Sequence, residues 1–360
     1  MKRGCAGFRN PAAAKITLEK PPKSLWIQFM SIFQADHLST FDDVRSAAER
    51  LDGLAVRTPL IANAALDERM GAPIRIKAEP LQRTGSFKFR GAYNALSRLD
   101  DPARRRGVVA FSSGNHAQGV AEAARLLDIS AIIVMPSDAP EIKKAGVIAR
   151  GAELKLYDRE TESREDLAQA LCEESGRTLI PSFDHPHIIA GQGTCGLEIF
   201  EQLKARGERA GRLVCCVGGG GLIGGINLAA EALSPDTETF GAEPEGFDDH
   251  ARSLASGQLE SNARKGGSVC DALLSPAPGE LTFAINKRRL SGVGVITDEE
   301  AMQAVRFAFE HLKIVVEPGG AAALAAVLSG KIAPAAQGVT VIVLTGGNVD
   351  PAVFAKAIGA

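Results

Sequence analysis

Residues 213–225 read LVCCVGGGGLIGG: a short apolar run, four consecutive glycines, and the start of a second apolar segment. A buried strand that ends in a glycine turn and continues into a helix is the building unit of α/β proteins. Four glycines in a row cost conformational entropy, which argues against an ordinary tight turn. Backbone N–H groups without neighbouring side chains can close on a phosphate, and a helix N-terminus favours its negative charge. The stretch predicts an α/β fold with an anion-binding loop.

The same strand–loop–helix pattern recurs along the chain from about residue 40. Apolar runs predict strands at 108–111, 131–135, 213–217, 239–242 and 339–344, and helical apolar spacing follows at 117–127 and 223–233. Repeated units of this kind predict parallel sheets with helices on both faces. Because ligands of such sheets bind beyond the carboxyl ends of the strands, the glycine-containing turns after residues 111, 217 and 344 mark the candidate site.

The overall composition is that of a globular chain and excludes several classes of protein. The 360 residues are 45% hydrophobic and 23% charged, enough for one large core or two domains. A formal net charge of -2 gives no reason to expect nucleic acid as a partner. No apolar run reaches the ~20 residues that span a bilayer, so no membrane partner is expected. The six cysteines form no zinc-spaced cluster, which fits a reducing cytoplasm. Residues 1–35, with Pro11, Pro21 and Pro22, predict an irregular N-terminal extension.

Residues 84–91, TGSFKFRG, place Lys88 between two phenylalanines. Burial there would lower the pKa of the ammonium group and make the amine a better nucleophile toward an aldehyde. The alternative is a surface lysine on an amphipathic helix, which is the more common case for a lysine considered alone.

Residues 112–116, SSGNH, form a strand-to-helix turn that offers hydroxyls, an amide and backbone N–H groups to a substrate carboxylate. Serine and asparagine are also favoured helix N-caps, so a simple capping loop is equally compatible with this turn.

A dinucleotide site is the main competing interpretation of the glycine loop. Gly219, Gly221 and Gly224 fit the pattern G-x-G-x-x-G, and Glu243 lies about where a ribose-binding acid would be. Against this interpretation, such a loop normally follows the first strand of its domain, and this one comes late in the chain.

In combination and in this order, the motifs resemble those of fold-type II pyridoxal-phosphate enzymes, specifically the threonine/serine dehydratase and serine racemase family. The resemblance extends from about residue 40 to the end and rests on SFKFRG (86–91), SSGNHAQG (112–119), AGQGT (190–194), GGGGL (218–222), EPGGA (317–321) and TGGN (345–348). It implies a two-domain, tryptophan synthase β-like fold. Residues 36–106 and 185–360 would form a large cofactor-binding domain, and residues 107–184 a small mobile domain. It also implies a homodimer that acts on a small amino acid.

The resemblance assigns a role to each matching residue. Lys88 would carry pyridoxal phosphate as a Schiff base and act as the base at the substrate Cα. The cofactor contacts would be Phe87, Lys88, Asn115, Gly218, Gly219, Gly220, Gly221, Leu222, Glu317 and Thr345. The substrate contacts would be Ser112, Ser113, Gly114, Asn115, His116 and Arg164.

Two of these residues separate the activities within the family. Ser113 resembles the serine that faces the lysine across the substrate in the racemases, where it exchanges a proton; its alternative role is to bind the carboxylate only. Arg164 resembles an arginine that the racemases bring toward the substrate carboxylate, and its alternative is a solvated helix charge.

Glu243, the backbone carbonyl of Phe247 and Asp249 resemble the divalent-metal site of the racemase-like members. Oxygen donors of this kind suit Mg²⁺. Phe247 replaces the small residue usual at the carbonyl position, and an acidic loop without metal is the alternative.

The predicted reaction is β-elimination from a hydroxy-amino acid, giving a 2-oxo acid and ammonia. Threonine and serine are the first candidate substrates and 3-hydroxyaspartate is a further one. A neutral Thr345 hydroxyl at the pyridine nitrogen makes the cofactor a weaker electron sink, which suits elimination. Racemisation of serine or aspartate is the alternative on the same scaffold, and a nicotinamide-dependent oxidoreductase is the distant one.

Overall fold

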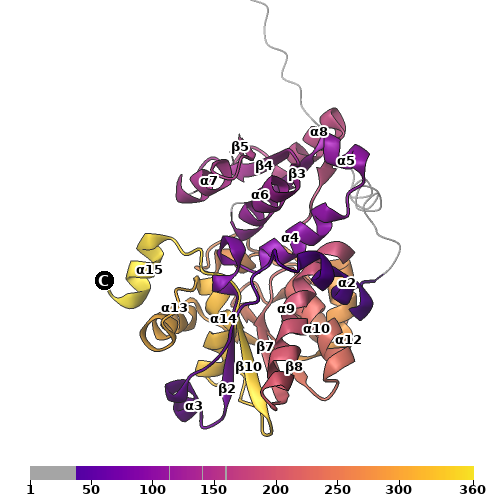
Figure 1. Ribbon diagram of the computed structural model, residues 1–360. Helices are drawn as coiled ribbons and strands as arrows, with labels where there is room; N and C mark the ends of the chain where they lie inside the picture. The colour runs from indigo at the N-terminus through magenta and orange to yellow at the C-terminus, as the bar shows by residue number, and fades with distance from the viewer. Residues whose placement is uncertain (1–37, 113, 140, 159) are drawn as a thin grey trace, which may run out of the picture. The chain divides into compact units, whose positions relative to one another are not determined.

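The computed structural model describes residues 38–112, 114–139, 141–158 and 160–360, all within one compact unit, His37–Ala360. The predicted N-terminal extension and Ser113 lie outside the described residues. The fold is mixed α/β with two separate sheets (Figure 1), which confirms the predicted fold class. No helix in the described ranges is long and apolar enough to cross a membrane.

The larger sheet has six strands in the order β1-β2-β10-β7-β8-β9. The first pair is antiparallel and the other four are parallel. The strands are β1 (Leu60–Ala62), β2 (Ile74–Ala78), β7 (Ala210–Cys216), β8 (Glu238–Pro244), β9 (Leu290–Ile296) and β10 (Val339–Leu344). The strands predicted at 213–217, 239–242 and 339–344 are therefore present, and β7 and β10 are neighbours whose carboxyl ends meet at one edge.

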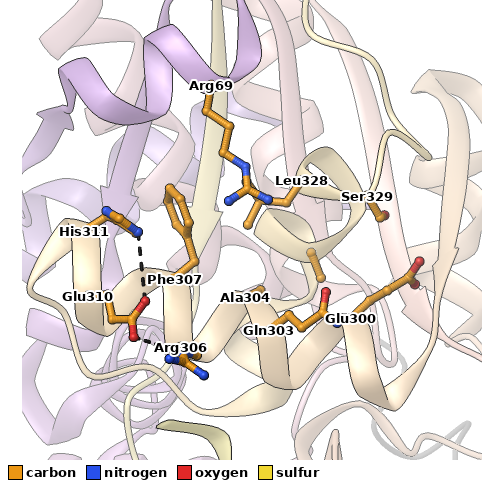
Figure 2. A pocket seen from close by; sticks show the side chains of 11 residues that line it. Arg69, Glu300, Gln303, Ala304, Arg306, Phe307, Glu310, His311, Leu328 and Ser329 are labelled. Atoms are coloured by element: carbon orange, nitrogen blue, oxygen red, sulfur yellow. Dashed lines mark hydrogen bonds and ion pairs between the residues drawn. The ribbon is translucent and has the colours of Figure 1, made fainter.

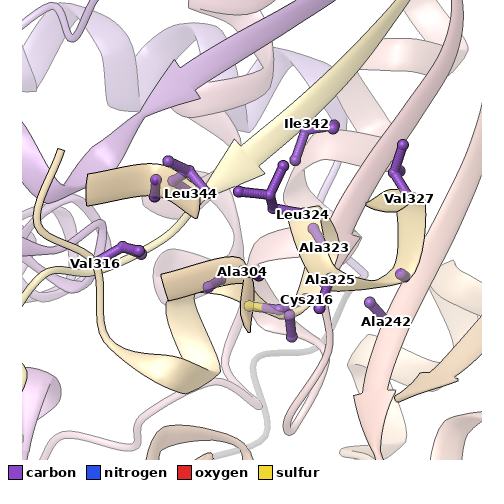
Figure 3. Packing of buried hydrophobic residues seen from close by; sticks show 14 of the residues in the cluster. Cys216, Ala242, Ala304, Val316, Ala323, Leu324, Ala325, Val327, Ile342 and Leu344 are labelled. Atoms are coloured by element: carbon purple, nitrogen blue, oxygen red, sulfur yellow. The ribbon is translucent and has the colours of Figure 1, made fainter. Parts of the chain in front are cut away.

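Helices cover both faces of this sheet because its strands are apolar on both sides. On one face, α14 (Pro318–Leu328) and α13 (Asp298–Phe307) pack their alanines against Cys216, Ile342 and Leu344 (Figure 3). On the other face, α9 (Pro186–Ala205) and α10 (Gly221–Leu233) pack against a second cluster that contains Cys215. Adjacent cysteines of β7 thus face opposite sides of the sheet, as strand geometry requires.

The smaller sheet has four parallel strands in the order β5-β4-β3-β6. They are β3 (Val108–Phe111), β4 (Ala131–Pro136), β5 (Glu153–Tyr157) and β6 (Thr178–Leu179). Helix α6 (Asn115–Leu127) packs on one face and α8 (Arg164–Ser175) on the other. All four strands lie within the predicted small domain, 107–184, whose boundaries stay a prediction.

The remaining elements complete the two layers or connect them. They are α2 (Phe41–Leu51), α3 (Ala64–Met70), η1 (Glu79–Leu81), η2 (Arg83–Gly85), α4 (Lys88–Ser97), α5 (Asp101–Arg106), α7 (Glu141–Ile148), α11 (Asp249–Ser256), η3 (Asp271–Leu273), α12 (Glu280–Arg289), η4 (Ala308–Leu312) and α15 (Pro351–Ile358).

Candidate active site

Lys88 is the first residue of α4, and its amine is partly enclosed. Its Nζ donates a hydrogen bond to the Ser182 carbonyl oxygen at 2.9 Å and lies 5.1 Å from the centre of the Phe87 ring. Burial lowers the pKa of Lys88 to about 8, although the nearby Glu317 carboxyl opposes the shift. A larger share of this amine is therefore neutral near pH 7 than in a solvated lysine.

The two phenylalanines that flank Lys88 are not equivalent. Phe89 is fully buried in the core beneath α6, where its ring lies 5.7 Å from that of Tyr93. Successive residues of a helix point in different directions, so only Phe87 lies beside the amine.

Buried ion pairs hold the first turn of α4 in place. Arg90 Nε and Nη2 each donate to Glu79 at 2.8 Å, and Arg90 Nη1 donates to Glu198 at 2.6 Å. Arg90 and Glu79 are fully buried. The position of Lys88, two residues earlier, is thereby tied to η1 and α9.

The glycine loop joins β7 to α10 and has no room for side chains at Gly219, Gly220 and Gly221. A Cβ on Gly219 would lie 2.3 Å from the Phe183 ring, and one on Gly220 would lie 2.6 Å from His250 Nε2. Gly220 also has φ 92°, which disfavours other residues. It is the N-cap of α10 and offers no side-chain hydrogen bond, so N–H groups of the first turn stay free for an anion. These features fit the phosphate of the predicted cofactor.

Gly224 does not need to be glycine, which weakens the dinucleotide interpretation. The third glycine of that fingerprint permits close helix–strand packing. A Cβ on Gly224 would instead find its nearest neighbour, Asn286 Oδ1, at 3.4 Å, an ordinary contact.

The segment between β6 and α9 also belongs to the site, and no sequence signal pointed to it. The Ser182 carbonyl oxygen receives the Lys88 hydrogen bond, and the next residue, Phe183, lies against Gly219 and Gly221. Asp184 then accepts backbone hydrogen bonds from Glu280 at 2.9 Å and Leu281 at 3.0 Å, at the start of α12. Three consecutive residues thus connect the lysine, the glycine loop and a helix of the large sheet.

Asn115 is held in one orientation by two side chains. Its Nδ2 donates to Glu317 Oε1 at 2.5 Å, and its Oδ1 accepts from Asn348 Nδ2 at 2.7 Å. Asn348 also donates to the Thr84 carbonyl oxygen at 2.8 Å. The second Nδ2–H of Asn115 is left to donate to a ligand oxygen, in keeping with the predicted cofactor contact. Asn348 ends the TGGN motif, but sequence reasoning gave it no role.

Glu317 is a buried carboxyl at the same place. Burial raises its pKa to about 7, and the neighbouring Asp271 adds to the shift, while the Asn115 amide opposes it. A Cβ on Gly346 would lie 2.1 Å from Glu317 Oε1, so this turn is closed around the carboxyl.

Thr345 follows β10 and is buried beside β7. Its Oγ1 lies 3.2 Å from Cys216 Sγ. Its carbonyl oxygen accepts from the Phe87 N–H at 3.2 Å, so it is adjacent to the lysine segment.

The predicted substrate turn is only partly tied to the site. Ser112 Oγ accepts from the Gly114 N–H at 3.2 Å, and the N-cap of α6 is Gly114, not a serine or an asparagine. His116 Nε2 lies 3.0 Å from the Ile180 carbonyl oxygen. Burial lowers the pKa of His116 to about 3, and the nearby Lys88 adds to the shift. The ring is therefore neutral and donates its Nε2–H to this carbonyl oxygen. Leu222, in the first turn of α10, is buried in the core of the large sheet.

Arg164 is engaged elsewhere in this structure. Its Nε donates to Glu165 Oε1 at 2.7 Å and its guanidinium lies 5.4 Å from the Phe111 ring centre. Neither contact involves the lysine, the glycine loop or Asn115, so a substrate role requires Arg164 to exchange partners.

The predicted metal ligands Glu243 and Asp249 lie together with His250, which the sequence analysis did not name. Potential ligand atoms of the three buried residues all lie within 4.8 Å of one another. His250 Nδ1 is 3.5 Å from Glu243 Oε1 and 3.7 Å from Asp249 Oδ2, and neither Nδ1 nor Oδ2 has a hydrogen-bond partner in the described part of the chain. This donor set fits a divalent cation. Phe247 is buried, and the role of its carbonyl oxygen stays a prediction.

A cavity of about 250 Å³ between α13, η4 and α14 contains none of the predicted site residues (Figure 2). Its lining charges are largely paired, for example Arg306 with Glu310 at 2.8 Å. It is separate from the lysine site.

Comparison with known proteins identifies the family. Residues 51–346 match the family model described as pyridoxal-phosphate dependent enzyme. The chain is 47% identical over 313 residues to L-threo-3-hydroxyaspartate ammonia-lyase of a Pseudomonas species, covering 87% of this chain and 96% of that protein. It is 41% identical to the L-threo-3-hydroxyaspartate ammonia-lyase of Saccharomyces cerevisiae, covering 89% and 96%. Maize serine racemase has a similar structure, with a TM-score of 0.83, 35% identity, and coverage of 90% and 98%. A family match over most of the chain, together with these relatives, shows that the chain belongs to the pyridoxal-phosphate dependent enzymes.

Proposed function

We propose that this chain is an ammonia-lyase that converts a hydroxy-amino acid to a 2-oxo acid and ammonia by β-elimination. The observation that carries the proposal is the convergence of a partly desolvated Lys88, a glycine loop without space for side chains, and an oriented Asn115 amide. When bound, pyridoxal phosphate supplies an aldehyde that condenses with amines and a ring that withdraws electrons from the substrate Cα.

Each residue of the site would have a separate task. Lys88 would hold the cofactor covalently and, once released, take the α-proton, for which a pKa of about 8 is well suited. When the Lys88 amine is not bonded to the cofactor, it would donate a hydrogen bond to the Ser182 carbonyl oxygen. The first-turn N–H groups of α10 would bind the phosphate, Asn115 Nδ2 would donate to the 3′-oxygen, and Thr345 would contact the ring nitrogen.

For the substrate, we favour 3-hydroxyaspartate over threonine and serine. Two relatives at 47% and 41% identity carry that name. A second carboxylate needs a cation, and we propose Arg164 for this role, because it starts α8 and its guanidinium lies 5.4 Å from the ring centre of Phe111, the last residue of β3. If Arg164 released Glu165 and bound the second carboxylate of the substrate instead, its guanidinium would gain a bidentate partner.

Racemisation of serine or aspartate is the second candidate, because maize serine racemase matches the structure closely. Elimination and racemisation share the first proton transfer. Elimination then expels the β-hydroxyl, whereas racemisation returns a proton to the opposite face of Cα. Ser113, which lies outside the described residues, is the predicted determinant. Ser113→Ala should reduce racemisation more than elimination, and an equal loss of both would assign it to carboxylate binding alone.

The central experiment is to load the protein with pyridoxal phosphate and offer L-threo-3-hydroxyaspartate, L-threonine and L-serine in parallel. Formation of 2-oxo acid and ammonia, together with the enantiomeric ratio of remaining substrate, identifies reaction and substrate in one assay. Lys88→Ala should lose the borohydride-fixable visible absorption band and all turnover. A Lys88→Ala variant that turns over normally would refute the proposal, as would a wild-type protein that shows no visible band.

We further propose a divalent-cation site at Glu243, Asp249 and His250. The two buried carboxylates suit Mg²⁺ or Mn²⁺ with water ligands, and the His250 imidazole would lie beside the ion. Either ion should raise the melting temperature of the holoenzyme, because ligands that bind only the folded state stabilise it. Glu243→Gln should abolish this increase, whereas Glu245→Gln, an exposed acid in the same loop, should keep it. A cation effect that is equal in both variants would exclude the site.

A cytoplasmic homodimer is also proposed. The described cysteines Cys172, Cys195, Cys215, Cys216 and Cys270 are all free and buried, as expected in a reducing compartment. Sedimentation of the holoenzyme tests the dimer.

A further inference from the structure

Cys216 and Thr345 form a buried pair at the edge where two neighbouring strands end. Cys216 is the last residue of β7, and Thr345 directly follows β10, which lies parallel to β7. The exposed fractions are only 5% and 4%, and Sγ lies 3.2 Å from Oγ1. In the described part of the chain, no other hydrogen-bond partner of Thr345 Oγ1 is present.

The position of the Thr345 hydroxyl is fixed, but the direction of its proton is not. The Thr345 N–H donates to the Gly320 carbonyl oxygen at 3.2 Å, and its carbonyl oxygen accepts from Phe87 at the same distance. A β-branched side chain on a fixed backbone has few rotamers. The remaining freedom is which of the two groups donates, because both thiol and hydroxyl can be donor or acceptor.

The two proton arrangements offer different groups to the ring nitrogen of a bound cofactor. If the thiol donates to Oγ1, the hydroxyl proton is free to point to the ring nitrogen, which then remains unprotonated. If the hydroxyl donates to sulfur, only an oxygen lone pair is left, and it suits a protonated nitrogen.

We propose that Cys216 is a positioning residue, whose thiol donates to Thr345 and thereby directs the Thr345 hydroxyl proton at the ring nitrogen of pyridoxal phosphate. This inference rests on the proposed function. A thiol is a weak acceptor, so it competes poorly with a ring nitrogen for the hydroxyl proton. Hydrogen bonds in a chain polarise one another, so the thiol also strengthens the contact that the hydroxyl makes.

The neighbouring Cys215 supplies a matched control. It is equally buried and chemically identical, but it faces α9 and α10 on the opposite side of the sheet. Cys215→Ala and Cys216→Ala each remove a buried thiol from β7, and only the second removes the sulfur that lies 3.2 Å from Thr345 Oγ1.

The test compares the holoenzymes of the wild type, Cys215→Ala, Cys216→Ala and Cys216→Ser. Loss of one hydrogen bond in the chain should weaken cofactor binding by about threefold to tenfold in Cys216→Ala. Without the thiol, the Thr345 Oγ1 lone pair is free to accept from a protonated ring nitrogen. The midpoint of the pH titration of the visible band should therefore move downward, because positive charge on the ring nitrogen favours loss of the proton from Lys88 Nζ. Cys216→Ser restores a donor and should keep both values within about twofold of the wild type.

Two results would overturn the inference. The first is that Cys215→Ala and Cys216→Ala have equal cofactor affinities and equal titration midpoints. The second is that Cys216→Ser loses as much cofactor affinity as is expected for Cys216→Ala. The serine variant tests the inference even if Cys216→Ala fails to fold. Failure of the proposed function is a different observation, since the wild type itself would then show no visible band.

Discussion

At the scale of single residues, the orientation of one side-chain amide decides what the site offers to an oxygen of the cofactor. Asn115 accepts from Asn348 at Oδ1 and donates to Glu317 at Nδ2. Reversal of the amide would place two N–H donors face to face and two acceptors face to face. The donor presented to a ligand is therefore set by two residues more than 200 positions away in the chain.

Glu317 makes the stability of this arrangement depend on pH. Its pKa rises from an ordinary 4.5 to about 7 on folding, so the folded protein holds this proton more tightly than the unfolded chain. The resulting stabilisation is present below pH 4.5 and is lost as the pH rises to about 7, at ~1.4 kcal/mol per pH unit and about 3 kcal/mol at most.

Glu317→Gln removes this dependence. We expect the free energy of unfolding of the cofactor-free variant, minus that of the cofactor-free wild type, to be larger at pH 8 than at pH 5. Urea unfolding of both proteins at both pH values measures this difference. Glu153→Gln, on the exposed side of β5, is the control and should show no such change. A Glu317→Gln difference from wild type that is the same at both pH values would contradict the raised pKa.

At the scale of secondary-structure elements, the loop from β7 to α10 and the segment from β6 to α9 shape each other. The Phe183 ring fills the space where Gly219 lacks a side chain, and a Cβ on Gly221 would lie 3.1 Å from Phe183 Cβ. The glycines thus admit both the proposed phosphate and an aromatic ring that packs against the loop.

Gly219→Ala should force these two segments apart. A new methyl group 2.3 Å from the ring cannot be accommodated without movement, which costs about 1–3 kcal/mol of stability, and cofactor affinity should fall as well. Equilibrium dialysis with pyridoxal phosphate measures the affinity. Phe183→Ala in the same chain should relieve the clash and recover part of the stability. Gly224→Ala, which meets only ordinary contacts, should bind the cofactor normally. If it binds as weakly as Gly219→Ala does, the clash with the Phe183 ring is not the cause of the loss.

At the scale of the whole molecule, a buried ion network joins elements that are far apart in the sequence. Glu198 of α9 accepts from Arg90 of α4 and from Lys77 of β2, and both cations are fully buried. Glu79 completes the network beside Arg90. Each charge depends on the others, because a buried charge without its partner has lost its hydration without compensation.

Arg90→Met should therefore lower the free energy of unfolding by about 3–5 kcal/mol, because it leaves the fully buried Glu79 without its ion-pair partner and leaves Glu198 with Lys77 alone. Urea unfolding measures this loss, and weaker cofactor binding should accompany it, since Lys88 is on the same helical turn. Arg98→Met, at the exposed end of the same helix, should stay within about 0.5 kcal/mol of the wild type. Equal effects of the two substitutions would mean that the network contributes nothing beyond a surface charge.

Local sequence was sufficient to predict the strands, the parallel architecture and the glycine loop. The apolar run at 339–344 and the run at 108–111 became strands with those same limits. Periodicity, β-branched residues and glycine runs act over a few positions, so neighbouring residues alone determine these features. The motifs at Lys88 and Asn115 were recognised for the same reason.

The tertiary structure alone decided which distant groups meet. The Ser182 carbonyl oxygen reaches Lys88 across 94 residues, and Cys216 reaches Thr345 across 129. Such contacts depend on strand order, on register and on the face to which each side chain points. No short stretch of sequence contains that information, because it arises only when separate segments are packed against one another.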